Sequence, residues 1–180
     1  QDFARRLLPE ATRIIPEPEN DELDYYPCEL RWIQCGEQEA VNACVNSVLN
    51  LMKRTGLASG LANSDIVLLS GSHEVGRQIV EELDREPYGV SCTHIFAEGK
   101  LEQDRRKMAF FLGQPRVKAA TIHSFKGWES RMLVLHLNKA IRSEDLAGAY
   151  AAITRLKRDV RGSYITVVCS APQLADYGRT

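Results

Sequence analysis

Residues 65–83 read DIVLLSGSHEVGRQIVEEL and decide the fold class of this 180-residue chain. The stretch begins with the short apolar run 65–69, which is typical of a strand buried on both faces. The next three residues, SGS, form a turn. Beyond the turn, apolar side chains recur at helical spacing at Val75, Ile79 and Leu83. The stretch therefore predicts a buried strand that leads directly into an amphipathic helix.

The same alternation of strand and helix extends in both directions along the chain. Upstream, a predicted strand at 29–35 precedes a helix that begins with acidic residues and ends near Gly56. Further strands are predicted at 90–96, 117–122, 132–137 and 164–169. Apolar strands that alternate with amphipathic helices predict an α/β fold, with a mostly parallel sheet and helices on both faces.

A late helix is predicted between the last two strands, because apolar residues recur there at positions 146, 150, 153 and 156. Ser143 is expected to cap its first turn, where Glu144 and Asp145 complement the positive end of the helix dipole. The same helix is expected to include the stretch 150–158, which reads YAAITRLKR.

Composition limits the class of protein and excludes several functions. The hydrophobic fraction of 44% allows one compact core, and a formal net charge of −1 excludes a basic protein of the histone type. The five cysteines are scattered without a zinc-binding pattern, and no apolar run approaches the roughly 20 residues that cross a bilayer. We therefore expect a reduced, soluble, cytoplasmic protein without a metal site or a membrane partner.

Residues 1–28 are expected to form a lead-in to a single domain over residues 29–180. Four prolines lie among many acidic residues in this lead-in, after a short helical stretch near Phe3–Leu8. The first residue is Gln1 rather than Met, which suggests a piece of a longer protein. We expect this piece to be monomeric by itself.

Residues with chemical function are concentrated in 121–129, TIHSFKGWE, between two predicted strands. Ligands of open α/β sheets bind at the carboxyl ends of strands, where loops present polar groups. Three residues suit hydrogen bonds to phosphate oxygens, namely Thr121, His123 and Ser124. Lys126 supplies a positive charge, Gly127 permits close approach of another backbone, and Glu129 can accept hydrogen bonds from sugar hydroxyls. By composition alone, a solvated polar connection explains the stretch equally well.

Arg155 is the second candidate for a functional residue. It lies between the apolar positions Ile153 and Leu156, where a guanidinium needs a partner because burial of an unpaired charge is costly. Its planar fork suits a phosphate, and an arginine from a neighbouring domain can stabilise the charge that develops during phosphoryl transfer. Taken alone, such an arginine more often forms a salt bridge within its own domain.

Together, TIHSFKGWES at 121–130 and YAAITRLK at 150–157 resemble motifs V and VI of superfamily 1 DNA helicases of the UvrD/Rep class. The common forms of these motifs read roughly T-x-H-x-x-K-G-L-E and Y-V-A-x-T-R-A, and the strand between them also matches. The resemblance extends with lower specificity over residues 29–169. It implies the C-terminal RecA-like domain of a motor with a P-loop NTPase fold, which uses ATP and Mg²⁺ to move 3′-to-5′ on single-stranded DNA.

The resemblance implies a role for each matching residue. Contacts with the single-stranded DNA backbone would come from Thr121, His123 and Ser124. Contacts with ATP would come from Gly127, Glu129 and Arg155. Glu129 would take the ribose, whereas Arg155 would reach the γ-phosphate as the catalytic arginine finger. The supporting residues would be Lys126, Tyr150 and Thr154.

Three departures limit what the resemblance implies. Trp128 and Ser130 replace the usual leucine and apolar residue, which alters the packing beside Glu129 but not its chemistry. Only residues 84–116 lie where many relatives insert a large helical domain, which favours a compact helicase or translocase. No G-x-x-x-x-G-K-[ST] occurs, so ATP and Mg²⁺ would be held mainly by an upstream RecA-like domain of the same polypeptide. This chain alone is expected to be inactive.

The sequence leaves other functions open. The main alternative is a non-enzymatic nucleic-acid-binding module that retains helicase-like motifs, and a helicase fused to a nuclease is a third. A Walker A sequence upstream of Gln1 would favour the enzyme.

Other candidate features have ordinary explanations. The basic cluster 105–107 is expected to form a solvated helix face, and Trp32 is expected in the core, while Trp128 could stack on a base. The histidines without metal-ligand spacing are His73, His94 and His136.

Overall fold

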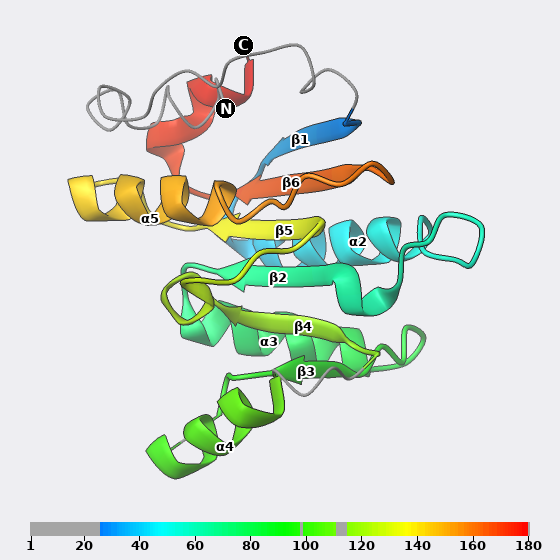
Figure 1. Cartoon of the computed structure of the whole chain (residues 1–180). Helices are drawn as coiled ribbons and strands as arrows, with labels where there is room; N and C mark the ends of the chain where they lie inside the picture. Colours follow the sequence, from blue (N-terminus) through cyan, green and yellow to red (C-terminus); the bar gives the residue numbers. More distant parts are fainter. Residues whose placement is uncertain (1–25, 98, 111–114, 180) are drawn as a thin grey trace.

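The computed structural model describes residues 26–97, 99–110 and 115–179. Six strands form one sheet in the order β1-β6-β5-β2-β4-β3, and every neighbouring pair is parallel (Figure 1). The strands are β1 (Cys28–Gln34), β2 (Ile66–Ser70), β3 (Cys92–His94), β4 (Val117–Thr121), β5 (Met132–Leu137) and β6 (Ser163–Cys169). The predicted α/β class with a parallel sheet is confirmed.

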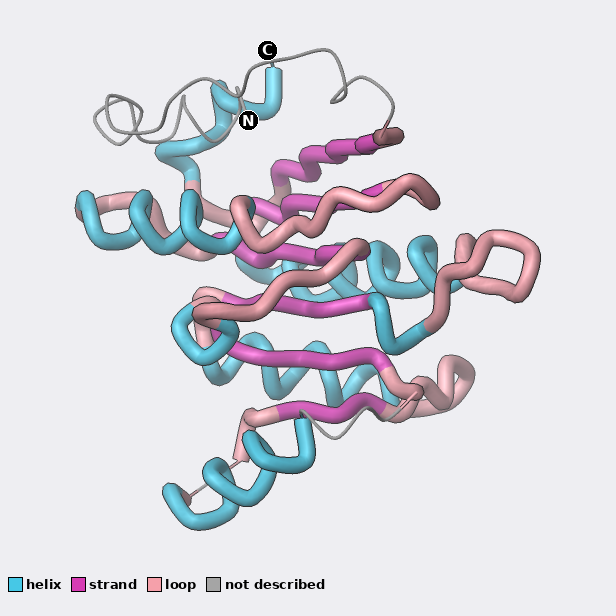
Figure 2. Tube along the Cα trace, viewed as in Figure 1, coloured by secondary structure: helices cyan, strands magenta, loops and turns pink. Residues whose placement is uncertain are grey.

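Helices cover both faces of this sheet (Figure 2). On one face lie α2 (Ala40–Met52) and α3 (His73–Asp84), and on the other lies α5 (Ser143–Ile153). Helix α4 (Lys100–Phe110) lies beside the edge strand β3. The 3-10 helices are η3 (Glu37–Glu39), η4 (Asn63–Asp65), η5 (His123–Phe125) and η6 (Pro172–Arg179). Among the described helices, none combines the length and apolar character that a membrane span requires.

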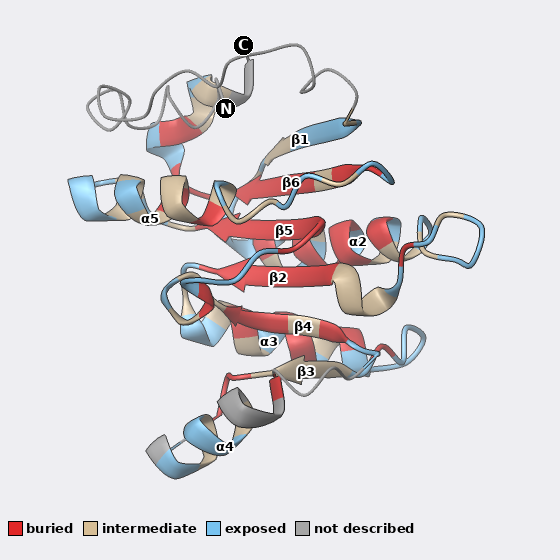
Figure 3. Cartoon of the chain, in the orientation of Figure 1, coloured by how far each residue is buried: buried red, intermediate tan, exposed pale blue. Residues whose placement is uncertain are grey.

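The central strands β2 and β5 are buried along their whole length (Figure 3). Their side chains alternate between the two layers: Val67 and Leu69 pack on the side of α5, whereas Ile66 and Leu68 pack on the side of α2 and α3. Because both faces are covered, neither strand has a solvent-exposed face. The apolar runs at 66–69 and 132–135 are therefore a direct consequence of the layered fold.

The structure differs from two local predictions, the cap of the late helix and the length of the strand at 90–96. Ser143 does not cap α5: the cap is Arg142, and the carboxylate of Asp145 accepts hydrogen bonds from the backbone of Ile141 and Arg142 at 3.2 and 3.0 Å. The predicted strand 90–96 shrinks to the three residues of β3, because Val90 instead donates its backbone N–H to Leu83 at the end of α3. In both places a local side chain or turn contact overrides the sequence pattern.

Trp32 and the basic cluster 105–107 were both expected to have structural roles. Trp32 is half-buried against the core on the α5 side, and Arg106 in the basic cluster forms an ion pair with Glu102 on α4. Both agree with a structural role rather than a binding role. The helical stretch predicted near Phe3–Leu8 lies outside the described residues.

His136 is a buried polar residue near the carboxyl end of β5. Its side chain is 1% exposed, and its two ring nitrogens lie 3.2 Å from the Ser70 hydroxyl and 3.3 Å from the Ser170 hydroxyl. Burial lowers the pKa of this imidazole from 6.5 to about 4. His136 therefore connects the ends of β2, β5 and β6 in its neutral form, a role that its isolated position in the sequence did not predict.

Acidification should reduce stability through His136. In the unfolded chain the imidazole of His136 takes up a proton near pH 6.5, whereas in the folded chain it does so only near pH 4. The free energy of unfolding therefore falls as the pH drops through this window. The contribution is roughly 3 kcal/mol in total. Urea unfolding between pH 7 and pH 4 should show a shallower pH dependence in His136→Gln than in the wild type. Identical slopes in the two proteins would contradict this role.

Candidate functional site

Thr121 ends β4, and the chain turns there into η5. The Thr121 hydroxyl donates to the Ser124 hydroxyl at 2.9 Å, and the Ser124 backbone N–H donates back to Thr121 Oγ1 at 3.2 Å. His123 projects into solvent from this turn, whereas Phe125 is buried against the sheet. We call Thr121, His123 and Ser124 the carboxyl-end site, because they follow the carboxyl end of β4.

The carboxyl-end site borders a pocket of about 370 Å³. Thr121 and His123 form one wall of the pocket, and Asn138 and Lys139 form another where the chain leaves β5. The polar side chains are therefore available to a ligand at the edge of the sheet where open α/β folds bind their ligands.

Beyond Phe125, the loop returns along the sheet to the amino end of β5. This return is required because β4 and β5 run parallel in the same sheet. Gly127 has a φ of 89°, a left-handed conformation that side-chain-bearing residues rarely adopt. Trp128 and Glu129 follow it at the solvent-exposed amino end of the sheet. The expectation that all of 121–129 lies at the carboxyl ends of the strands is therefore wrong for Glu129.

Ser130 connects the loop to the segment that contains Arg155. Its backbone N–H donates to the Arg155 carbonyl at 2.9 Å, and its carbonyl accepts from the Lys157 N–H at 2.8 Å. These two bonds form an isolated parallel bridge between Ser130 and Leu156. The backbones at Glu129 and Arg155 are consequently adjacent in the fold although the two residues are far apart in sequence.

The apolar residues around Arg155 predicted that it lies on the late helix, but the structure places it beyond the end of α5. Helix α5 ends at Ile153, where the Thr154 hydroxyl donates to the Ala151 carbonyl at 2.9 Å. The Arg155 Nε donates to the same carbonyl at 3.2 Å. The helix cannot continue, because the backbone from Arg155 onwards pairs with Ser130 instead. The half-buried Arg155 therefore projects from a turn that two elements hold in place.

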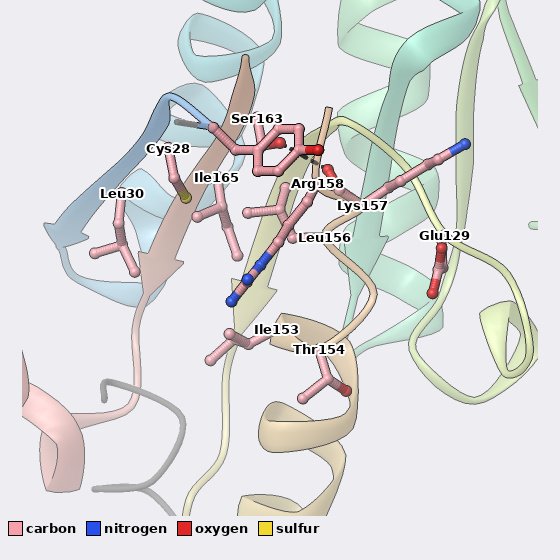
Figure 4. Close-up of a pocket in the computed structure, with 11 residues that line it drawn as sticks. Cys28, Leu30, Glu129, Ile153, Thr154, Leu156, Lys157, Arg158, Ser163 and Ile165 are labelled. Atoms are coloured by element: carbon pink, nitrogen blue, oxygen red, sulfur yellow. Dashed lines mark hydrogen bonds between the residues drawn. The ribbon is translucent and has the colours of Figure 1, made fainter. Parts of the chain in front are cut away.

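A pocket of about 470 Å³ opens beside this turn (Figure 4). Its polar side chains include those of Glu129, Thr154, Lys157 and Arg158. Its apolar floor consists of Leu30, Ile153, Leu156 and Ile165. In Figure 4 the Arg158 side chain extends over this floor, and Glu129 lies at the other end of the pocket. Arg155 is not among the residues that line this pocket, and its Nε hydrogen bond to Ala151 holds the base of its side chain against the end of α5. We call the pocket residues Glu129, Thr154, Lys157 and Arg158, together with the adjacent Arg155, the amino-end site.

The remaining predicted residues, Lys126 and Tyr150, lie outside the two pockets. Lys126 is exposed on the loop between them, and Tyr150 lies half-buried on the last turn of α5. The Tyr150 carbonyl accepts a hydrogen bond from the Thr154 N–H at 3.0 Å, which closes the helix before Arg155. In the part of the chain that the structure describes, no group of three or more His, Cys, Asp or Glu side chains is placed to bind a metal.

Arg131 is a buried charge that the sequence analysis missed. Its side chain is 10% exposed and forms ion pairs with Asp65, in η4, and with Asp159, whose Oδ1 lies 3.5 Å away. Arg161 also binds Asp159, at 2.8 Å, and hydrogen bonds from Arg161 hold the pKa of that carboxyl below its usual range. The network fixes the chain on both sides of the Ser130 bridge. The one feature of the sequence that could have indicated this buried charge is its position directly before the predicted strand 132–137.

Comparisons with known proteins concern the fold. Neither the protein-family models nor the curated proteins give a match. Among solved structures, the chain is similar to the C-terminal domain of a possible DNA helicase from Lactobacillus plantarum WCFS1, with a TM-score of 0.53 and 14% sequence identity. The match covers 97% of this chain and 87% of that chain. The α/β fold of this chain, with its parallel sheet, is therefore similar to the fold of that domain.

Removing the Arg131 charge should destabilise the domain. Arg131→Met leaves the carboxylates of Asp65 and Asp159 without their shared partner, which should lower the free energy of unfolding by about 3 kcal/mol. The matched control is Arg161→Met, because Arg161 binds the same Asp159 but is 49% exposed and should contribute less than about 1 kcal/mol. Urea unfolding measures both. Equal losses in the two variants would contradict a buried network centred on Arg131.

Proposed function

We propose that this chain is the C-terminal motor domain of an ATP-dependent DNA helicase or translocase of the UvrD/Rep class. The observation that carries the proposal is the Ser130 bridge, which joins the segment resembling motif V to the segment resembling motif VI. A fold similar to the C-terminal domain of a possible DNA helicase supports it. The order of the two motifs along the chain supports it as well.

The amino-end site is the proposed nucleotide site. Glu129 accepts hydrogen bonds from the ribose hydroxyls of ATP, and the loop at Gly127 leaves room for the sugar. Arg155 stabilises the charge on the γ-phosphate as an arginine finger. Its Nε bond to the end of α5 fixes the base of the guanidinium, while Thr154 and Tyr150 fix the turn. Because the chain has no Walker A sequence, ATP and Mg²⁺ are held mainly by an upstream RecA-like domain of the same polypeptide.

The carboxyl-end site is the proposed contact with single-stranded DNA. Hydroxyl groups of Thr121 and Ser124 and the ring of His123 suit phosphate oxygens, which position a strand without reading its sequence. This site lies one strand length from Glu129, roughly 17 Å for the five residues of β4. One loop, 122–131, connects the two sites. Closure of the two motor domains around ATP at one end of the loop can therefore move the DNA contact at the other end.

Arg155→Ala should reduce DNA-stimulated ATP turnover in the whole polypeptide by about a thousandfold, because an arginine finger acts on the transition state. Affinity for single-stranded DNA should stay within about twofold of the wild type. The matched control is Arg85→Ala, since Arg85 is an exposed arginine that follows α3 and lines neither site's pocket. The isolated 180-residue chain should show no turnover. Normal turnover in Arg155→Ala, or turnover by the isolated chain, would refute the motor assignment.

His123→Ala should weaken binding of single-stranded DNA and reduce the dependence of that binding on salt, because a phosphate contact is lost. Fluorescence anisotropy with a labelled oligothymidylate, repeated over a series of salt concentrations, measures both effects. Lys53→Ala is the control, since Lys53 is an exposed residue directly after α2. An unchanged affinity and salt slope in His123→Ala would remove His123 from the DNA contact.

A further inference from the structure

Trp128 is a large aromatic residue that remains 45% exposed on the loop beside Glu129. A pocket of about 220 Å³ lies next to it, at the amino ends of β2, β4 and β5. The residues that line this pocket include Phe125, Trp128 and Glu129 from the loop, Lys118 near the start of β4, and Lys157 from the segment after α5. We call it the Trp128 pocket.

The Trp128 pocket and the larger pocket of the amino-end site share two residues. Glu129 and Lys157 line both, so they form the boundary between the two hollows. On one side of this boundary lies an exposed indole, and on the other side lie the Thr154 hydroxyl and the Arg158 guanidinium. A ligand that crosses the boundary therefore meets an aromatic surface, then a carboxylate, then cationic and hydroxyl groups. A nucleotide presents matching groups in that order: base, ribose and phosphates.

We propose that Trp128 stacks on the base of the bound nucleotide and is a ligand-binding residue of the amino-end site. This inference rests on the proposed function, which places the ribose on Glu129. Stacking on an indole uses the flat face that every base has, and a purine covers more of the indole than a pyrimidine does. The family resembled here has leucine at this position, so the aromatic contact is a property of this chain.

The turn that presents Trp128 is held on both sides. The backbone N–H of Trp128 donates to the Phe125 carbonyl at 3.2 Å. Phe125 is buried, and the centroid of its ring lies 6.4 Å from that of Phe110. On the other side, Ser130 is buried in the bridge to Leu156. A base that stacks on Trp128 therefore meets a surface whose backbone is already ordered, which reduces the entropic cost of binding.

The position of Trp128 argues against stacking on a DNA base. Trp128 lies at the amino ends of the strands, whereas Thr121 and His123 line the pocket at the carboxyl ends. A strand held by His123 would have to run along the whole sheet to reach the indole. The nucleotide that contacts the neighbouring Glu129 has no such distance to cross.

Intrinsic fluorescence gives a direct test, because the chain contains only two tryptophans, Trp32 and Trp128. In Trp32→Phe, the remaining emission comes from Trp128, and ADP should quench it in a saturable way at millimolar concentrations. Ligand-observed NMR on the 180-residue chain should show about tenfold weaker ADP binding in Trp128→Ala than in the wild type. Trp128→Phe should recover part of the loss. Ribose 5-phosphate, which has no base, should bind the wild type and Trp128→Ala equally.

The other outcomes overturn the proposal in separate ways. If ADP binds Trp128→Ala as tightly as the wild type, the stacking contact is refuted while the nucleotide site stands. If Trp128→Ala weakens an oligothymidylate instead of ADP, the indole belongs to the DNA contact. If neither ADP nor tripolyphosphate binds the wild-type chain, the proposed nucleotide site at Glu129 and Arg155 fails, and the role of Trp128 fails with it.

Discussion

The two backbone hydrogen bonds of Ser130 are the interaction on which the rest of the arrangement depends. They pair the end of one loop with the turn after α5, so that Glu129 and Arg155 lie at the same edge of the sheet. The Ser130 hydroxyl also donates to the Asp65 carbonyl, and the next residue, Arg131, forms ion pairs with Asp65 and Asp159. The segment at Asp65 before β2, the loop before β5 and the segment between α5 and β6 are thereby fixed to one another.

A parallel sheet explains why the candidate residues fall into two groups rather than one. The connection from β4 to β5 must travel back along the sheet, so its first residues lie at the carboxyl ends of the strands and its last residues at the amino ends. The buried Phe125 holds the middle of this loop against the sheet. In the proposed motor, one short segment thus touches DNA at one end and nucleotide at the other, which is the mechanical link that coupling requires.

The sequence predicted the elements well wherever burial alone determines them. The strand 132–137 was predicted with its observed bounds, because a strand covered on both faces is apolar at nearly every position, here at all but His136. Predictions failed where distant contacts decide. Arg155 was assigned to a helix because nothing in the local pattern reveals the bridge to Ser130 that ends α5 at Ile153. The motif resemblance selected Glu129 without showing which end of the sheet it occupies, since that depends on the path of the whole loop.

The central claim is that Glu129 and Arg155 act on the same bound nucleotide, and a double-mutant cycle tests it most directly. ATP turnover would be compared in the whole polypeptide for the wild type, Glu129→Gln, Arg155→Ala and the double variant. The account predicts that the two effects on kcat/KM are coupled by about 1 kcal/mol or more. Effects that add to within about 0.5 kcal/mol would show that the two side chains work independently and would contradict the account.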